Sequence, residues 1–145
     1  MISQILATLS CGIFAGAAIY ISFVEQPARL SCGSALAVRE WRSSYKRGSR
    51  MQASLAVLSS VLAFFSWWMR DNTAWLIGGL LLFAVVPFTL ILAFPTNRRL
   101  QSDELDVSSV QAEQLLRRWG GLHAVRSGLS FLAFLIFLFA LQRKS

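Results

Sequence analysis

Four long apolar blocks constrain what this 145-residue chain can fold into more than any other feature. Each block is about 17–23 residues long, and roughly 20 apolar residues are needed to cross the hydrocarbon core of a bilayer. They cover residues 2–24, 53–69, 74–94 and 122–141. A soluble bundle is the alternative, but nearly uncharged runs of this length would aggregate in water. We therefore expect an all-α protein, one domain of residues 1–145 folded as a four-helix transmembrane bundle in the lipid bilayer.

The first block has two features that bear on its role. It lacks the charged start of a signal peptide and is longer than the usual apolar region of about 7–15 residues, so we expect it to remain as a membrane helix. Gly12 and Gly16 form a GxxxG pair, a spacing that lets two helices approach closely in lipid. A stripe of small and polar residues also runs along it at helical spacing: Cys11, Ala15, Ala18, Ser22 and Glu25.

Basic residues gather in two of the three connections between the blocks. Ten of the fourteen Lys and Arg residues lie in residues 25–52 and 95–121, whereas Arg70, Arg143 and Lys144 lie on the opposite side of the predicted membrane. The positive-inside rule then predicts both long loops in the cytoplasm and both termini outside, in an inner or plasma membrane. Because this topology accounts for the net charge of +7, we expect no nucleic-acid partner, and the loops would lie against anionic headgroups.

The sequence offers little for a metal, a haem or a disulfide. Its two cysteines, Cys11 and Cys32, fall at different depths of the predicted topology and cannot pair. No CxxC or other metal-ligand spacing is present, and His123 is the sole histidine. We therefore predict no metal and no bound cofactor.

The long connections carry helical patterns of their own. "SALAVREWRSSYKRG" predicts a short interfacial helix on the cytoplasmic side, ended by Gly48, with Val38, Trp41 and Tyr45 on one face. In "SSVQAEQLLRRW", Ser108 is a candidate N-cap and Gln111 follows at the spacing of a capping box. The fourth helix is thus predicted to begin near Ser109 and to run for about 30 residues.

A polar stripe in the last helix is the strongest sign of a site. Trp119, His123, Arg126 and Ser130 recur at a spacing that keeps them on one helix face. An arginine near hydrocarbon is costly unless it is paired or hydrated, so this face is predicted to point inward. Glu25 is the predicted partner of Arg126. Such a group either fastens the first helix to the fourth or lines a pocket, and intramembrane ionisable residues favour the pocket.

Asn97, just beyond the third block, falls at the same level in the predicted topology. Three segments far apart in sequence, "FVEQPA", "FPTNRRL" and "WGGLHAVR", therefore converge on one end of the bundle. The other end offers only the turn at Arg70 and the tail.

The segments "PFTLILAFPTNRRLQ" and "LLRRWGGLHAVRSGLSF" resemble the anthrone oxygenase-like family of small four-helix membrane proteins. The positions that carry this resemblance are Pro87, Phe88, Thr89, Pro95, Thr96, Asn97, Leu100, Trp119, His123 and Arg126. The first half resembles the family more weakly, through Gly16, Pro27, Trp41 and Tyr45. Fungal members that act on anthrones have Asn where this chain has His123, so the resemblance supports the fold and the site more than the substrate.

The resemblance implies oxidation of a flat, anthrone-like substrate to a quinone by O2 without a cofactor. His123 would then be the base, since imidazole accepts a proton near neutral pH, and Glu25 would orient or replace it. Arg126 and Asn97 would stabilise the negative oxygen that forms. The expected substrate contacts are Trp41, Tyr45, Trp119, Thr96 and Thr89. The three aromatic residues fit equally well a simple aromatic belt at the membrane interface.

Other functions fit the same residues. A non-catalytic membrane module would bind a lipid headgroup, a quinone or a partner helix in this pocket. A transporter would need several copies of so small a bundle to form a path. The sequence does not decide between a monomer and a homo-oligomer.

Overall fold

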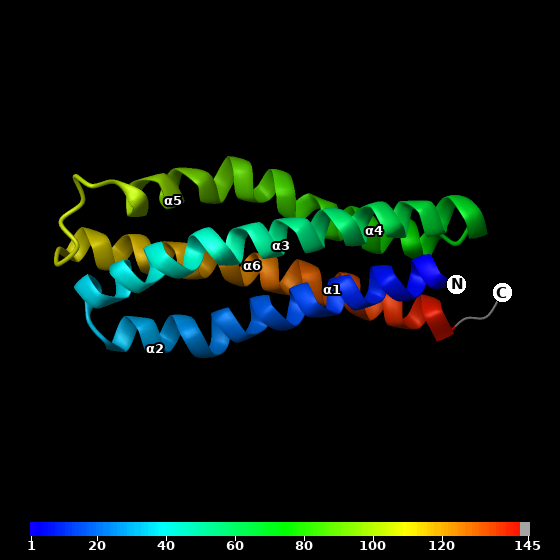
Figure 1. Ribbon diagram of the computed structural model, residues 1–145, viewed down its shortest axis with the longest axis horizontal. Coiled ribbons are helices and arrows are strands. Elements are labelled where there is room, and N and C mark those ends of the chain that lie inside the picture. Colours follow the sequence, from blue (N-terminus) through cyan, green and yellow to red (C-terminus); the bar gives the residue numbers. More distant parts are fainter. Residues whose placement is uncertain (143–145) are drawn as a thin grey trace.

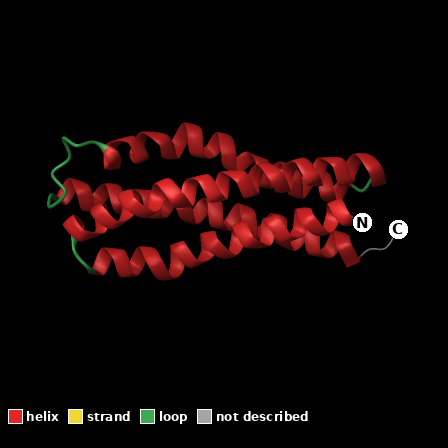
Figure 2. Ribbon diagram, viewed as in Figure 1, coloured by secondary structure: helices red, strands yellow, loops and turns green. Residues whose placement is uncertain are grey.

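The protein is a bundle of four long helical rods (Figures 1 and 2). The computed structural model describes residues 1–142, and Arg143 and Lys144 of the charge comparison lie outside this range. Within it, four rods are long and apolar enough to cross a membrane. The rods are α1 (Ile2–Tyr20) with η1 (Ile21–Glu25) and α2 (Gln26–Ser31); α3 (Ser34–Arg70); α4 (Thr73–Phe88) with η2 (Thr89–Ala93) and α5 (Phe94–Gln101); and α6 (Val110–Gln142). Each predicted apolar block lies within one rod.

The rods run up and down the long axis of the molecule (Figure 1). α1 packs against α3 and α6, and α4 packs against the same two helices. The N-terminus, the α3–α4 turn and the end of α6 lie at one end of the bundle, and the two longer connections lie at the other. We call these the terminal end and the loop end. The predicted grouping of the connections is therefore confirmed.

Local signals explain where the rods begin and end. Asp71 adopts a left-handed conformation (φ 49°) that closes α3, and Asn72 Oδ1 then accepts from Ala74 N–H at 3.0 Å to cap α4. The cap of α6 is Ser109, whose Oγ accepts from Ala112 N–H at 3.1 Å. The predicted start of this helix is confirmed, although the capping residue is Ser109 and not Ser108.

The predicted interfacial helix ending at Gly48 is wrong, because α3 runs without a break from Ser34 to Arg70. A glycine within a helix costs about 1 kcal/mol relative to alanine, and it ends the helix only where the chain turns left-handed.

Only Gly12 of the predicted GxxxG pair lies close against another helix. A Cβ at Gly12 would lie 2.8 Å from the Phe134 ring of α6, whereas Gly16 has no such neighbour within 4 Å.

Two π-helical turns interrupt the rods: η1 lies between α1 and α2, and η2 lies between α4 and α5. Pro27 and Pro95 each lie two residues beyond one of these turns. A proline has no N–H to donate, and its ring crowds the carbonyl four residues back, here Phe23 and Ile91 inside the turns. The backbone is widened to a π turn just before each of these two prolines, and π turns are frequent at functional sites.

Buried apolar residues form two separate cores. The terminal core consists of Ala7, Cys11, Phe14, Ala18, Ala56, Ala63, Trp75, Leu82, Val85, Ala133, Phe137 and Ala140. The loop-end core consists of Ala37, Val38, Trp41, Leu100, Ala112, Leu115, Leu116 and Trp119. Between them, α3 and α6 carry buried polar side chains, among them Gln52, His123 and Arg126. The candidate site is this polar layer, which has the terminal core on one side and the loop-end core on the other.

Candidate functional site

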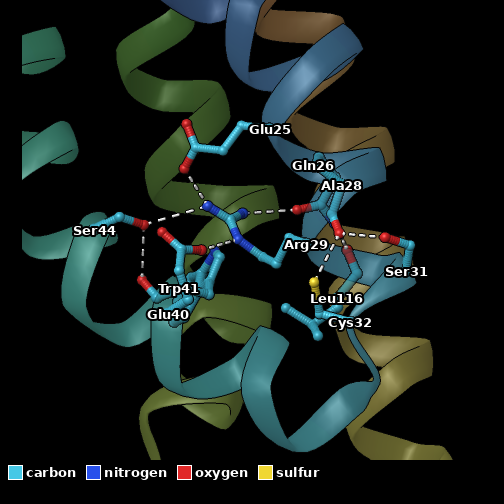
Figure 3. Close-up of polar contacts among 10 residues, drawn as sticks. All are labelled: Glu25, Gln26, Ala28, Arg29, Ser31, Cys32, Glu40, Trp41, Ser44 and Leu116. Atoms are coloured by element: carbon cyan, nitrogen blue, oxygen red, sulfur yellow. Dashed lines mark hydrogen bonds and ion pairs between the residues drawn. The ribbon is translucent and has the colours of Figure 1, made fainter.

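A buried arginine, Arg29 of α2, bonds to residues of α3 on the loop-end side of the polar layer (Figure 3). Its partners are Glu25 and Glu40 through ion pairs, and Gln26 Oε1 and Ser44 Oγ through hydrogen bonds of 2.7 and 3.3 Å. Gln26 in turn donates to the Leu116 carbonyl of α6 at 2.8 Å. Because this cation is paired with two carboxylates, it needs no ligand to be stable in the interior.

The predicted pairing of Glu25 with Arg126 is wrong, because Glu25 pairs with Arg29 one turn along the same rod. A partner four residues away comes into reach as soon as the helix forms, whereas Arg126 lies on another helix. Glu25 still lines the same cavity as Arg126.

Arg126 is also buried, but its surroundings hold far fewer hydrogen-bond acceptors than those of Arg29. It is 8% exposed, and one terminal nitrogen (Nη2) donates to Gln52 Oε1 at 3.0 Å. Its guanidinium carbon lies 5.8 Å from the Phe14 ring centroid. Among the residues that the structure describes, no carboxylate forms an ion pair with it, and its Nε has no hydrogen-bond acceptor. A buried cation without a counter-charge is costly, so this group is suited to receive an anionic ligand.

His123 is held from one side by a chain of hydroxyl groups. Its Nδ1 lies 3.1 Å from Ser22 Oγ, which lies 2.8 Å from Ser127 Oγ. Ser127 Oγ is 2.9 Å from the Ala18 carbonyl and 3.1 Å from the His123 carbonyl, and both of these atoms only accept. If the single Ser127 proton goes to one of these carbonyls, Ser22 donates to Ser127 and His123 Nδ1–H donates to Ser22. In that arrangement the lone pair lies on Nε2, where a neutral imidazole can accept a proton.

Three aromatic rings form the wall on the loop-end side of His123. Tyr45 stacks on Trp41 with ring centroids 4.6 Å apart and planes at 17°, and Trp119 meets Trp41 edge-on at 5.8 Å. The Trp119 ring also lies 4.8 Å from the His123 ring. Asn97 Nδ2 donates to the Tyr45 hydroxyl at 2.9 Å, which links α5 to this wall. The site thus has flat apolar surfaces on one side and hydrogen-bonding groups on the other.

Two cavities meet in the polar layer. The first, of about 120 Å³, is lined by Trp41, Trp119, His123 and the ion-paired Glu25 and Arg29, together with Ile21, Ser44, Tyr45, Gly48, Ser49, Gln52 and Arg126. The second, of about 140 Å³, is lined mostly by residues of α3, α4 and η2, with Thr89 among them. Tyr45, Ser49, Gln52 and Arg126 line both. We call these the aromatic cavity and the apolar cavity, and they lie back to back across Gln52 and Arg126.

The sequence-predicted site residues fall into three groups. Glu25, Trp41, Tyr45, Trp119, His123 and Arg126 all line the aromatic cavity, and Thr89 lines the apolar one. Asn97 reaches the site through Tyr45, and Thr96 is buried beside it on α5. Within residues 1–142, no cluster of three or more His, Cys, Asp or Glu residues is placed to hold a metal ion.

Gln52 and Arg29 contribute to this region but were not predicted as site residues. Gln52 is an uncharged amide at the edge of a serine-containing block, and nothing in its spacing marks it as a partner of Arg126. Arg29 is one of many basic residues in its loop, and only the fold shows that it is 6% exposed.

Comparison with known proteins gives one consistent result. A family model described as "Anthrone oxygenase" matches residues 41–136, a range that contains both tryptophans of the wall, Gln52, His123 and Arg126. The chain is 30% identical to anthrone oxygenase encC of Aspergillus fumigatus, over 82% of this chain and 81% of that protein. It is 26% identical to anthrone oxygenase tpcL of the same organism, over 88% and 85% of the two chains. No solved structure matches the chain.

Proposed function

The chain belongs to the anthrone oxygenase family, and we propose that it oxidises a flat, anthrone-like substrate with O2 in the polar layer, without a bound cofactor. The observation that supports this proposal is the buried guanidinium of Arg126, which forms no ion pair among the described residues and lies beside His123 and the aromatic wall. The proposed reaction passes through an enolate, and these are the groups that an enolate of a flat polycycle requires.

The proposed chemistry balances with the residues at hand. His123 Nε2 removes a proton from the CH2 group of the central ring. The negative charge moves to the carbonyl oxygen of the same ring, which lies beside Arg126. The electron-rich carbon then reduces O2, a C–O bond forms, and the imidazolium returns its proton to give a hydroperoxide. Loss of the second ring proton and cleavage of the O–O bond release water and leave the quinone. One anthrone and one O2 thus give one quinone and one water.

The size of the cavities supports a substrate that spans both of them. A cavity of about 150 Å³ holds one benzene ring. The aromatic and apolar cavities, of about 120 and 140 Å³, therefore each suit a single ring. A linear three-ring substrate would place one outer ring in each and its central ring against Gln52 and Arg126. We propose this pose because it brings the reacting carbon and oxygen to the polar layer.

The test is O2 uptake by the purified protein in mild detergent with an added anthrone. We expect consumption of one O2 per anthrone, with the quinone appearing in the absorbance spectrum. A heat-treated sample corrects for slow spontaneous oxidation of the anthrone. Uptake no faster than this control, together with a lipid or quinone that co-purifies with the protein, would favour the non-catalytic binding module.

We further propose that the loop end faces the cytoplasm, because the basic residues of both long connections lie there. Cys32 is exposed at this end and Cys11 is buried in the terminal core, so a single thiol reports the topology. In intact bacterial cells, a membrane-impermeant maleimide is expected to leave Cys32 unlabelled until the cells are opened. Labelling of intact cells would reverse the proposed orientation.

A further inference from the structure

Among the described residues, Gln52 has a hydrogen-bond donor without an acceptor, and it lies next to Arg126. A guanidinium only donates, so the atom of Gln52 that receives Arg126 Nη2 at 3.0 Å is the amide oxygen. The amide nitrogen, Nε2, is then a donor, and it is buried without an acceptor among the described residues. Arg126 Nε is in the same condition. Two donors on adjoining side chains are therefore both unused.

Unused buried donors are rare in native proteins, because each one loses its hydrogen bonds to water on folding. One such atom alone has many explanations. Gln52 Nε2 and Arg126 Nε belong to side chains that contact each other and that line both cavities, so a ligand oxygen placed between them would satisfy both donors. That oxygen would carry negative charge, because Arg126 has no other counter-charge within the described residues.

We propose that Gln52 Nε2 and Arg126 Nε together form the binding site for the anionic oxygen of a flat aromatic ligand, a phenolate or an enolate. This inference rests on the proposed function and names a second residue for its central step. Gln52 has two roles in it: its oxygen orients the guanidinium, and its nitrogen supplies the second hydrogen bond. Lysine at position 126 would keep the charge but could not present this paired geometry.

One substitution, Gln52→Glu, distinguishes anion binding from a purely structural role of Gln52 and Arg126. If Gln52 and Arg126 only fasten α3 to α6 and bind no anion, a carboxylate is an equal or better partner, and the variant should fold and bind the dye as the wild type does. If Gln52 and Arg126 bind an anionic oxygen, the substitution removes one donor, neutralises the cation and adds a repelling charge. The two readings thus predict opposite effects on ligand binding.

The probe is 2-hydroxyanthraquinone, whose absorbance shifts to longer wavelength when its hydroxyl group ionises. We expect the wild-type protein in detergent to bind it as the phenolate at a pH where the free dye is still protonated. Gln52→Glu is expected to bind about 100-fold more weakly, comparable to the effect of losing one donor from an oxyanion site, and to lose the colour shift. Thermal unfolding checks that the variant folds.

The matched control is Ser59→Ala on the same helix. Ser59 is fully buried and donates to the Ala7 carbonyl at 2.7 Å, but it belongs to the terminal-end half of the bundle and lines neither cavity. It should bind the dye as the wild type does. A folded Gln52→Glu variant with wild-type affinity and colour shift would overturn the inference, as would a wild type that binds only the neutral dye.

This experiment is independent of turnover. Dye binding as the phenolate without O2 uptake from an anthrone would refute the oxygenase and leave the anion site standing. Normal O2 uptake by the wild type, together with unaltered dye binding in Gln52→Glu, would refute the anion site and leave the oxygenase standing.

Discussion

Replacing Arg126 with methionine is expected to lower the rate of anthrone oxidation by at least about 100-fold without destabilising the protein. The rate falls because no cation remains to stabilise the enolate oxygen. Stability is retained because the substitution removes a buried charge that has one hydrogen bond and, within residues 1–142, no carboxylate partner. The loss of that bond leaves Gln52 Oε1 without a donor, which offsets part of the gain.

The measurement combines O2 uptake with thermal unfolding in the same detergent. Arg117→Met is the matched control, because Arg117 lies on the same helix but is exposed and pairs with Glu113 at 2.8 Å. This control should oxidise anthrone normally, and its stability should change by less than about 1 kcal/mol. Wild-type turnover in Arg126→Met would remove Arg126 from the proposed mechanism. A large fall in melting temperature would instead identify it as a structural residue.

Replacing His123 with glutamine is expected to lower the turnover number by about 10²–10⁴-fold while the substrate still binds. Glutamine can keep the hydrogen bond to Ser22 but cannot accept a proton as imidazole does. If His123 only packed against Trp119, its replacement would lower ligand affinity and protein stability together with turnover. The readout is therefore the separate effect on the turnover number and on the affinity for 2-hydroxyanthraquinone.

Two further variants sharpen this prediction. Ser130→Ala, deeper on the same stripe, removes a bond to the Ser127 carbonyl and should leave turnover unchanged. His123→Asn tests the residue that fungal members of the family are expected to carry at this position. Wild-type turnover in either His123 variant would move the base to Glu25, whose carboxylate lines the same cavity.

The sequence predicted the rods and one face of the site because both depend on periodicity along a single helix. The length of the apolar blocks identifies the rods, and the spacing of Trp119, His123 and Arg126 places them together on α6. The partners across helices were not predictable in the same way. Gln52 meets Arg126 only because α3 and α6 have a particular rotation about their axes, and that rotation is set by packing of both cores. The orphaned donors at Gln52 and Arg126 depend on that same packing.

The two π turns have a consequence for the angular phase of their helices. On α1 the buried positions run Ala7, Cys11, Phe14 and Ala18, and continuing the same repeat by seven residues gives Glu25, yet the buried residue is Gln26. On the other rod, Val85 leads by the same count to Leu92, which is 49% exposed, whereas Ala93 is buried. Each turn thus holds one residue more than a regular helix would need.

This extra residue explains why counting from the N-terminus gave Glu25 the inward position that Gln26 occupies. It also means that both halves of each rod would stay in phase with their cores if the residue were removed. The additional residue is therefore not required for packing at either end. What it changes is the width of these two rods at the height of the two cavities, where the proposed three-ring substrate would lie.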